Sequence, residues 1–208
     1  MGMRKNLWLN EAPLILASTS QTRLKLLQDI FIPVEAIGAA VNERAIEAEL
    51  QQTGASPSQV AVALAKAKGE DVAQRNPGRW IIAADQTLAL IEHQFHKPET
   101  IEKARDQLQC LRGKTHQLHS AVVCYFGGEM RFAHVETAQL TMRNFGDAFL
   151  ESYLQASGDR VKQSVGAYQI ETLGVHLFDK VEGDHSTILG LPLLPLLAFF
   201  RKAGLVEA

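Results

Sequence analysis

The chain has little cysteine and no membrane-length apolar run, and both absences narrow its class. Its 208 residues include two cysteines, Cys110 and Cys124, which lack CxxC spacing and are too few for a disulfide framework. We therefore expect a cytoplasmic protein in a reducing compartment. The first residues hold no apolar core typical of a secretory signal. The longest apolar stretch, Ile188–Phe200, is too short for a bilayer and contains two prolines, so we expect no membrane partner.

The chain also has no large excess of charge of one sign. The 21 Lys and Arg residues are scattered along the chain and are balanced by 23 Asp and Glu residues, for a formal net charge of -2. This balance offers no basic field for nucleic acid, and no basic tract is interleaved with aromatic residues, so we expect no nucleic-acid partner. The HExxH, P-loop, GxSxG and Rossmann glycine motifs are absent as well.

What the chain does contain is an alternation of apolar runs and helical patterns, which predicts an α/β fold. Leu14–Ala17 and Trp80–Ala84 are apolar runs typical of strands buried on both faces. His116–Tyr125 and Arg131–Met142 form a predicted hairpin across two glycines, so the sheet should be mixed. The other predicted elements are helices over 43–52, 57–74, 100–111 and 146–156, short strands over 168–170 and 175–181, and a helix that begins at Pro192 and ends before Gly204.

The segment Leu14–Leu27 predicts an anion site. Its strand passes through Ser18, Thr19 and Ser20 directly into a helical pattern. A strand that turns into a helix in this way directs unpaired N–H groups and hydroxyls at one spot, where the helix dipole favours negative charge. Arg23, one turn into the helix, adds a cation suited to phosphate. An ordinary capped helix after a strand would give the same pattern.

Four charged residues are candidates for chemistry on a polyphosphate. Asp85 directly follows the second buried strand, and ligands in open α/β sheets bind outside the carboxyl ends of strands. Such a carboxylate can hold a divalent cation or take a proton from water, and Glu43 offers a second oxygen ligand. Lys68 and Lys97 could neutralise phosphate. The alternatives are a turn Asp, a first-turn Glu and two solvated lysines.

Eight segments, in order along the chain, resemble the Maf-like family of nucleoside triphosphate pyrophosphatases. Each motif is short, but the ordered set is specific and reaches from Leu14 to about Leu205. The segments are LILASTS…R…LL at 14–27, VNE at 41–43, LAKAK at 64–68, ADQ at 84–86, HKP at 96–98, A…L…L.GK.H at 104–116, GAYQIE at 166–171 and EGD…ILGLPL at 182–193.

The resemblance implies an inosine triphosphatase-like (Maf/Ham-type) α/β fold. It implies a mixed twisted sheet with flanking helices and two lobes around a central cleft, in a single domain over residues 1–208 that is often a homodimer. The implied reaction is hydrolysis between the α- and β-phosphates of a nucleoside triphosphate, with Mg²⁺ or Mn²⁺. Asp85 matches the family's proton acceptor. The other implied roles are phosphate or metal contact for Ser18, Ser20, Arg23, Lys68 and Lys97, and metal ligation for Glu43 and Asp85.

Departures from the common family pattern bear on the substrate. The usual Ser-Pro-Arg-Arg is Ser-Gln-Thr-Arg here, so that Thr22 replaces a cation. Gln86 and Glu171 replace a Thr and a Gln, and this pair resembles the subgroup that acts on 7-methyl-GTP. A carboxylate accepts hydrogen bonds from N1–H and the N2 amine of guanine, whereas pyrimidine carbonyls would repel it. That subgroup also carries a Trp near Thr22, which this chain lacks.

Three alternatives remain open at this level. The first is a preference for dTTP and UTP, and the second is an inosine or xanthosine triphosphate pyrophosphatase on the related fold. The third is a regulatory nucleotide-binding protein, because Maf-like proteins are linked to septum formation and arrest of cell division. All three share the expected nucleoside triphosphate ligand, and release of pyrophosphate separates the enzymes from the regulator.

Overall fold

The structure, a computed structural model, describes residues 7–91 and 93–207 as an α/β protein. The predicted fold class is therefore confirmed. The strands are β1 (Leu14–Leu16), β2 (Val34–Ala36), β3 (Ile81–Leu90), β4 (His93–Phe95), β5 (Thr115–Phe126), β6 (Glu129–Met142) and β7 (Phe178–Glu182). The helices are α1 (Gln21–Asp29), α2 (Glu43–Gln52), α3 (Pro57–Arg75), α4 (Ile101–Leu111), α5 (Asp147–Ser157), α6 (His185–Ile188) and α7 (Leu193–Lys202), with 3₁₀ turns η1 (Gly158–Lys162), η2 (Val165–Ala167) and η3 (Leu173–Leu177).

The sheet contains both parallel and antiparallel strand pairs, as predicted. Its hydrogen-bonded order is β2-β1-β3-β5-β6-β7, with β4 on β3. The β1 strand pairs in parallel with β2 and β3, whereas β4 pairs antiparallel with β3 and β7 antiparallel with β6. The predicted hairpin joins β5 to β6, and both loop glycines, Gly127 and Gly128, have positive φ, as a two-residue hairpin turn requires.

The described residues fall into two compact units. Unit 1 comprises the described residues up to Gln86, together with Ser120–Glu136 and the described residues from His185 onward. Unit 2 comprises the described parts of residues 87–119 and Thr137–Asp184. The single domain over residues 1–208 stays a prediction, and residues 1–6, 92 and 208 of that range lie outside the described residues. Across 7–91 and 93–207, no helix is both long and apolar enough to cross a membrane.

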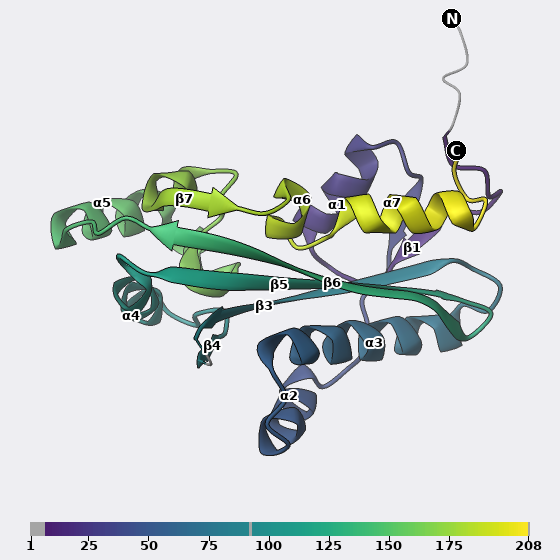
Figure 1. Ribbon diagram of the computed structural model, residues 1–208, viewed down its shortest axis with the longest axis horizontal. Helices are drawn as coiled ribbons and strands as arrows, with labels where there is room; N and C mark the ends of the chain where they lie inside the picture. Colours follow the sequence, from purple (N-terminus) through teal and green to yellow (C-terminus); the bar gives the residue numbers. More distant parts are fainter. Residues whose placement is uncertain (1–6, 92, 208) are drawn as a thin grey trace, which may run out of the picture. The chain divides into compact units, whose positions relative to one another are not determined.

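In unit 1, helices cover both faces of the strands, with α3 on one face and α1 and α7 on the other (Figure 1). Successive strand residues alternate between these faces. Ile81 and Ala83 of β3 therefore belong to the core cluster that includes α3 residues, whereas Ile82 and Ala84 belong to the cluster that includes α1 and α7 residues. The same alternation assigns Asp85 to the α3 face and Gln86 to the opposite face.

Side-chain caps explain why the predicted helices begin where they do. Asn42 accepts a hydrogen bond from the Ala45 amide at the start of α2, and Thr100 accepts one from the Lys103 amide at the start of α4. At α3, Ser56 forms a full capping box with Gln59, and Pro57 is the first helical residue. The bounds of these three helices agree with the sequence prediction to within one residue.

Two strand predictions were wrong, and a third placed the start of its strand too early. The β3 strand does not end before Asp85 but continues to Leu90: it lies beside β5 in the sheet, and its last three residues, Leu88–Leu90, also pair with β4. The region 168–170 is not a strand: Gly166 and Ala167 both have positive φ, and this left-handed backbone turns the chain out of an extended path. The strand predicted over 175–181 starts only at Phe178, after a 3₁₀ turn.

Candidate active site

Asp85 lies on β3 just beyond the point where β1 ends. The last pairs between these strands are Ile15 with Ile81 and Leu16 with Ile82, and the Ala17 amide donates to the Ile82 carbonyl over 2.8 Å. Past this point β1 no longer covers that edge of β3. The Asp85 carboxylate therefore lies beside the end of β1, in the middle of β3. The prediction that Asp85 follows the end of its own strand was wrong.

Lys68 reaches the Asp85 carboxylate from α3. Its helix buries Ala61, Leu64, Ala65 and Val72 at helical spacing, and Lys68 occupies the same core-facing stripe. The aliphatic stem thus runs inward, and the Lys68 Nζ lies 2.5 Å from Asp85 Oδ1. Only 12% of the lysine side chain and 10% of the aspartate side chain are exposed. This is a largely desolvated ion pair, not a surface one.

Glu43 joins the same ammonium from a third element. It is the first residue of α2, where the Asn42 cap and the helix N-terminus favour a carboxylate. Glu43 Oε1 lies 3.1 Å from Lys68 Nζ, and half of the Glu43 side chain is exposed. No residue of α2 is fully buried. One ammonium thus bridges a buried carboxylate on β3 and a half-exposed carboxylate on α2.

The loop between β1 and α1 carries the hydroxyls of Ser18 and Ser20. The Ser20 hydroxyl caps α1 by accepting from the Arg23 amide over 3.4 Å, and the Ser18 hydroxyl accepts from the Ser20 amide over 3.1 Å. Both hydroxyls act as acceptors here, so each keeps its own hydrogen for a further acceptor. Thr22, partly exposed, lies in the first turn of the same helix.

Arg23 does more than supply a cation. Its Nε donates to the Gly190 carbonyl and its Nη1 donates to the Ala84 carbonyl, each over 2.8 Å. Burial lowers the pKa of Arg23, and the nearby carboxylates of Asp85 and Glu43 oppose that shift. The guanidinium fork therefore joins the Gly190 turn to the backbone of β3 next to Asp85.

Gln86, predicted to set specificity, has its amide nitrogen on protein acceptors. Nε2 lies 2.8 Å from Ser120 Oγ, 3.0 Å from the Ile188 carbonyl and 3.2 Å from the Thr187 carbonyl. Ser120 itself donates to the Thr187 carbonyl over 2.7 Å, and the Thr187 hydroxyl donates to Glu136 over 2.9 Å. Ser120 and Thr187 were not predicted from the sequence, where the one signal for each is a hydroxyl residue beside an apolar run.

Lys97 and Glu171 belong to unit 2, whereas the residues described above belong to unit 1. Both are exposed, and within the described residues neither side chain has a hydrogen bond or an ion pair. Glu171 follows a tightly held segment. Ser164 Oγ donates to the Tyr168 carbonyl, and the Tyr153 hydroxyl donates to the Ala167 carbonyl over 3.1 Å.

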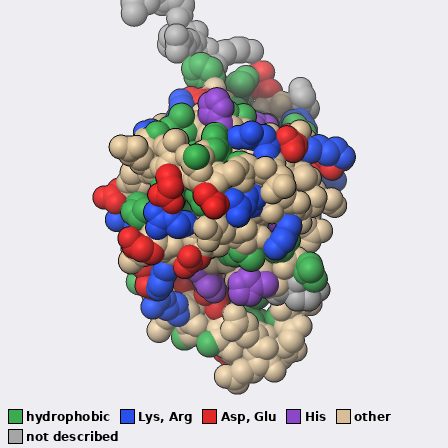
Figure 2. All heavy atoms as spheres, turned by 90° about the vertical axis from the view of Figure 1, so that its left-hand side faces the viewer, with side chains coloured by type: hydrophobic (Ala, Val, Ile, Leu, Met, Phe, Trp, Pro, Cys, Tyr) green, Lys and Arg blue, Asp and Glu red, His purple; other side chains and the backbone are tan. Residues whose placement is uncertain are grey.

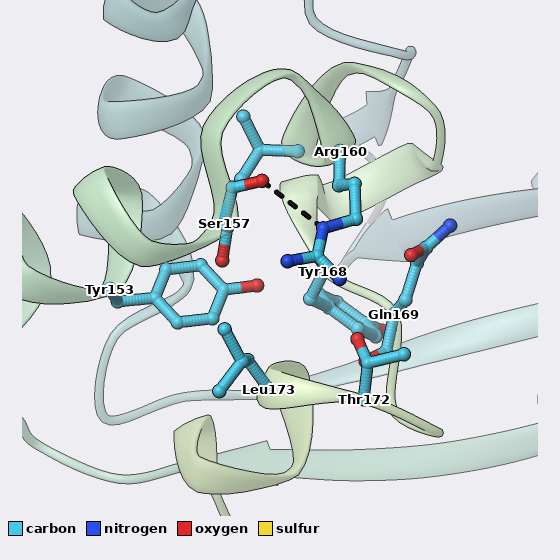
Figure 3. A pocket seen from close by; sticks show the side chains of 8 residues that line it. Tyr153, Ser157, Arg160, Tyr168, Gln169, Thr172 and Leu173 are labelled. Atoms are coloured by element: carbon cyan, nitrogen blue, oxygen red, sulfur yellow. Dashed lines mark hydrogen bonds between the residues drawn. The ribbon is translucent and has the colours of Figure 1, made fainter.

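A buried histidine also holds this segment. His116 Nε2 lies 2.8 Å from the Tyr168 hydroxyl, and burial lowers the pKa of His116 to about 4. Gly166 is required there because a Cβ would lie 2.5 Å from Leu88 Cδ1. Tyr168 also lines a small pocket, in which the Tyr153 phenol from α5 and the Arg160 guanidinium face each other (Figure 3). The backbone that leads to Glu171 is therefore fixed at several points.

Several surface charges of unit 2 form ion pairs. Arg105 Nε lies 2.7 Å from Glu151, and Arg112 Nη1 lies 2.6 Å from Asp147. In the view of Figure 2, basic and acidic side chains are intermixed instead of gathered by sign. Such exposed pairs contribute little to stability.

The donor set around Lys68 also fits a hard divalent cation. Glu43 and Asp85 direct carboxylate oxygens at one positive centre, and Mg²⁺ in proteins typically takes one or two carboxylates and completes its shell with water and phosphate. In residues 7–91 and 93–207, no group of three or more His, Cys, Asp or Glu side chains could hold a metal ion. These two carboxylates would thus need phosphate and water oxygens beside them.

Comparison with known proteins identifies the family. The model of the family described as "Maf-like protein" matches residues 13–203. A "Nucleoside triphosphate pyrophosphatase" of Rhodopseudomonas palustris is 49% identical over 201 residues, which cover 96% of this chain and 98% of the relative. A "7-methyl-GTP pyrophosphatase" of Brucella abortus is 47% identical over 194 residues, which cover 93% of this chain and 98% of the relative.

Among solved structures, the Ham1 protein of Staphylococcus aureus aligns with a TM-score of 0.42 and 18% identity, over 64% of this chain and 73% of that chain. A HAM1 protein from Coxiella burnetii aligns with a TM-score of 0.40 and 14% identity, over 64% and 74%. The sequence relatives align over nearly their whole length, and the family model spans the elements from β1 to α7. The chain therefore belongs to the Maf-like protein family.

Proposed function

We propose that this protein is a nucleoside triphosphate pyrophosphatase, which hydrolyses the bond between the α- and β-phosphates to give a nucleoside monophosphate and pyrophosphate. Relatives at 47–49% identity carry the names nucleoside triphosphate pyrophosphatase and 7-methyl-GTP pyrophosphatase. The observation that carries the proposal is the cluster of Lys68, Glu43 and Asp85, in the same compact unit as the hydroxyl-bearing loop of Ser18 and Ser20. Cations, hydroxyls and carboxylates together suit an anionic substrate with a hydrolytic water.

Asp85 is the proposed general base. Water attacks the α-phosphorus, the new P–O bond forms as the bond to the β-phosphate breaks, and the water proton passes to the Asp85 carboxylate. Lys68 and Lys97, together with the hydroxyls of Ser18 and Ser20, bind phosphate oxygens. Arg23 adds positive charge while it fixes the backbone at Ala84. When bound to Glu43 and Asp85, a divalent cation, Mg²⁺ or Mn²⁺, would neutralise charge on the phosphates and the leaving pyrophosphate.

The preferred substrate proposed here is 7-methyl-GTP, within a housecleaning role against non-standard nucleotides. The Glu171 carboxylate is exposed and follows a segment fixed by Ser164, Tyr153 and His116. It can therefore accept hydrogen bonds from the N–H groups of guanine with little loss of conformational entropy. Thr22 and Gln86 complete the proposed specificity set, with Gln86 acting through the turn that it holds. A preference for dTTP and UTP, or for inosine or xanthosine triphosphate, is the alternative.

The remaining parts of the proposal concern context. We place the protein in the reducing cytoplasm because it has two cysteines without CxxC spacing, and the buried Cys124 thiol has a pKa raised by burial, which disfavours reactive thiolate. A single Maf-like domain with a central cleft, a homodimer and a link to septum formation are proposed on the family's pattern. None of them enters the chemical mechanism.

One experiment tests the function. Purified protein is incubated with Mg²⁺ and, separately, with 7-methyl-GTP, GTP, UTP, dTTP and inosine triphosphate, and pyrophosphate and phosphate are measured. We expect stoichiometric nucleoside monophosphate and pyrophosphate, with the fastest turnover for 7-methyl-GTP. Fastest turnover of a pyrimidine would overturn the guanine preference. Binding without pyrophosphate release for every nucleotide would overturn the enzymatic function in favour of a regulatory binder.

A further inference from the structure

We propose that in the nucleotide-free protein the Lys68 ammonium occupies the place of the divalent cation, so that cation and nucleotide bind together. The inference rests on the proposed function, which supplies the cation and the phosphates. Its consequence is that free protein binds divalent cations weakly, and that the metal–nucleotide complex is what enters the site.

The geometry places one positive charge between the two carboxylates. Lys68 Nζ lies 2.5 Å from Asp85 Oδ1 and 3.1 Å from Glu43 Oε1. The two carboxylate oxygens are therefore no farther apart than these two contacts laid end to end, and the ammonium fills the space between them. A metal ion bound to the same oxygens would meet a like charge within a few ångströms, at a site mostly removed from water. Lys68 must move for the cation to enter.

The two cations near Asp85 differ in their freedom to move. Arg23 is held at two points, by hydrogen bonds to the Gly190 and Ala84 carbonyls. Lys68 carries its charge on a flexible four-carbon stem, and its two ion pairs are the hydrogen-bonding contacts of its ammonium among the described residues. Lys68 is thus the cation that can leave.

A phosphate group is what makes this movement favourable. If Lys68 left both carboxylates while a metal ion entered, a largely buried ammonium would lose its partners beside a doubly charged cation. A triphosphate brings anionic oxygens that can receive the ammonium at the same time. Metal binding and phosphate binding therefore favour each other, and the coupling passes through Lys68.

The experiment measures Mn²⁺ binding to nucleotide-free protein, from the loss of the electron paramagnetic resonance signal of free Mn²⁺. The wild type is compared with Lys68→Met, which keeps the stem and removes the charge. Lys66→Met is the matched control, because Lys66 lies on the same helix and is exposed. We expect Lys68→Met to bind Mn²⁺ at least about tenfold more tightly than the wild type, and Lys66→Met to differ from the wild type by less than about threefold.

A second readout guards against loss of folding. Removal of the ammonium leaves two carboxylates facing each other, so Mn²⁺ should raise the thermal midpoint of Lys68→Met more than that of the wild type. If Lys68→Met does not fold, Lys68→Gln, a neutral side chain that still donates a hydrogen bond, gives the same comparison.

Equal Mn²⁺ affinity in the wild type and the neutral variant would overturn the inference, as would an equal gain in Lys66→Met. The proposed function fails in a different assay. If the wild type releases no pyrophosphate from any nucleotide, the function is wrong whatever the Mn²⁺ titration gives. If the wild type does release pyrophosphate but Lys68→Met gains no affinity, the function stands and Lys68 does not hold the cation's place.

Discussion

The two faces of β3 handle neighbouring polar residues in opposite ways. On the α3 face, Asp85 is paired with the Lys68 ammonium, and a half-exposed glutamate completes the cluster. On the other face, the neutral amide of Gln86 donates to backbone carbonyls and a serine hydroxyl. One step along a strand thus separates a charged cluster from a neutral one.

The two clusters suit different purposes on one strand. A charged cluster whose partners can be exchanged for metal and phosphate suits a reaction cycle. A neutral amide on backbone carbonyls holds the turn at Thr187 and Ile188, and substrate charges do not compete for those bonds. Arg23 links the two sides, because its guanidinium binds the carbonyl of Ala84, directly before Asp85, and that of Gly190 beyond the turn.

The largest effect of a substitution on either face of β3 is expected at Asp85. Asp85→Asn keeps the shape of the side chain but removes the proposed base, so kcat should fall by at least about a thousandfold while the protein still folds. Steady-state pyrophosphate release and circular dichroism check the two halves of this expectation. Asp179→Asn, an exposed aspartate on β7, is the matched control and should retain full turnover. Full activity of Asp85→Asn would remove this residue from catalysis.

The neutral pair His116–Tyr168 in unit 2 sharpens the contrast between charged and neutral clusters. The pKa of buried His116 is lowered to about 4, from about 6.5 in an unfolded chain, so the unfolded state binds the proton first. The contribution of neutral His116 to the free energy of unfolding is therefore fully present above about pH 6.5. It is lost as the pH drops towards about 4, and the total loss is about 3 kcal/mol. Urea unfolding at both pH values should show this loss in the wild type and a smaller loss in His116→Phe. Equal losses would contradict it.

Gln86 offers the test on the neutral face of β3. Gln86→Met keeps the length of the side chain but leaves the Thr187 and Ile188 carbonyls without this donor, so the free energy of unfolding should fall by about 1–3 kcal/mol. The midpoint of urea unfolding gives the measurement. Gln139→Met, an exposed glutamine on β6, should cost less than about 0.5 kcal/mol. If both variants lose the same amount, the amide does not hold the turn.

Arg23 gives the smallest expected effect. Arg23→Lys keeps the positive charge, but a single ammonium cannot reproduce the fork that reaches both Ala84 and Gly190, so we expect a loss of about 1 kcal/mol in stability. KM should rise together with this loss of stability, because the Gly190 turn and the β1–α1 loop would shift. Arg201→Lys, on the exposed side of α7, is the control. An unchanged stability with a raised KM would show that Arg23 serves the substrate and not the turn.

Much of the fold was predictable because its signals are local. Ser56 and Pro57 mark the start of α3, and Thr100 marks that of α4, by hydrogen bonds within three residues. The end of β3 was not predictable in this way. Asp85 interrupts the apolar pattern, yet the strand continues beside β5, and β4, placed by a later turn, pairs with Leu88–Leu90. Pairing partners along a chain leave no trace in the strand itself.

The candidate site, too, was only partly predictable from the sequence. Ser20, Arg23, Lys68 and Asp85 could be singled out by residue type, position and resemblance. The distant backbone carbonyls that accept from the Arg23 and Gln86 side chains could not: Gly190 is 167 residues from Arg23, and Thr187 and Ile188 are 101 and 102 residues from Gln86. Every residue has a carbonyl, so no side chain marks the ones that a fold will use.

The helix that carries Glu43 has a dynamic consequence of its own. Because no residue of α2 is fully shielded from water, little apolar burial opposes the opening of its hydrogen bonds. The amides of α2 should therefore exchange with deuterated solvent sooner than those of α3, which buries seven of its residues. The Glu43 carboxylate thus lies on a helix with little apolar burial, whereas the Asp85 carboxylate lies on a strand that is buried in the core.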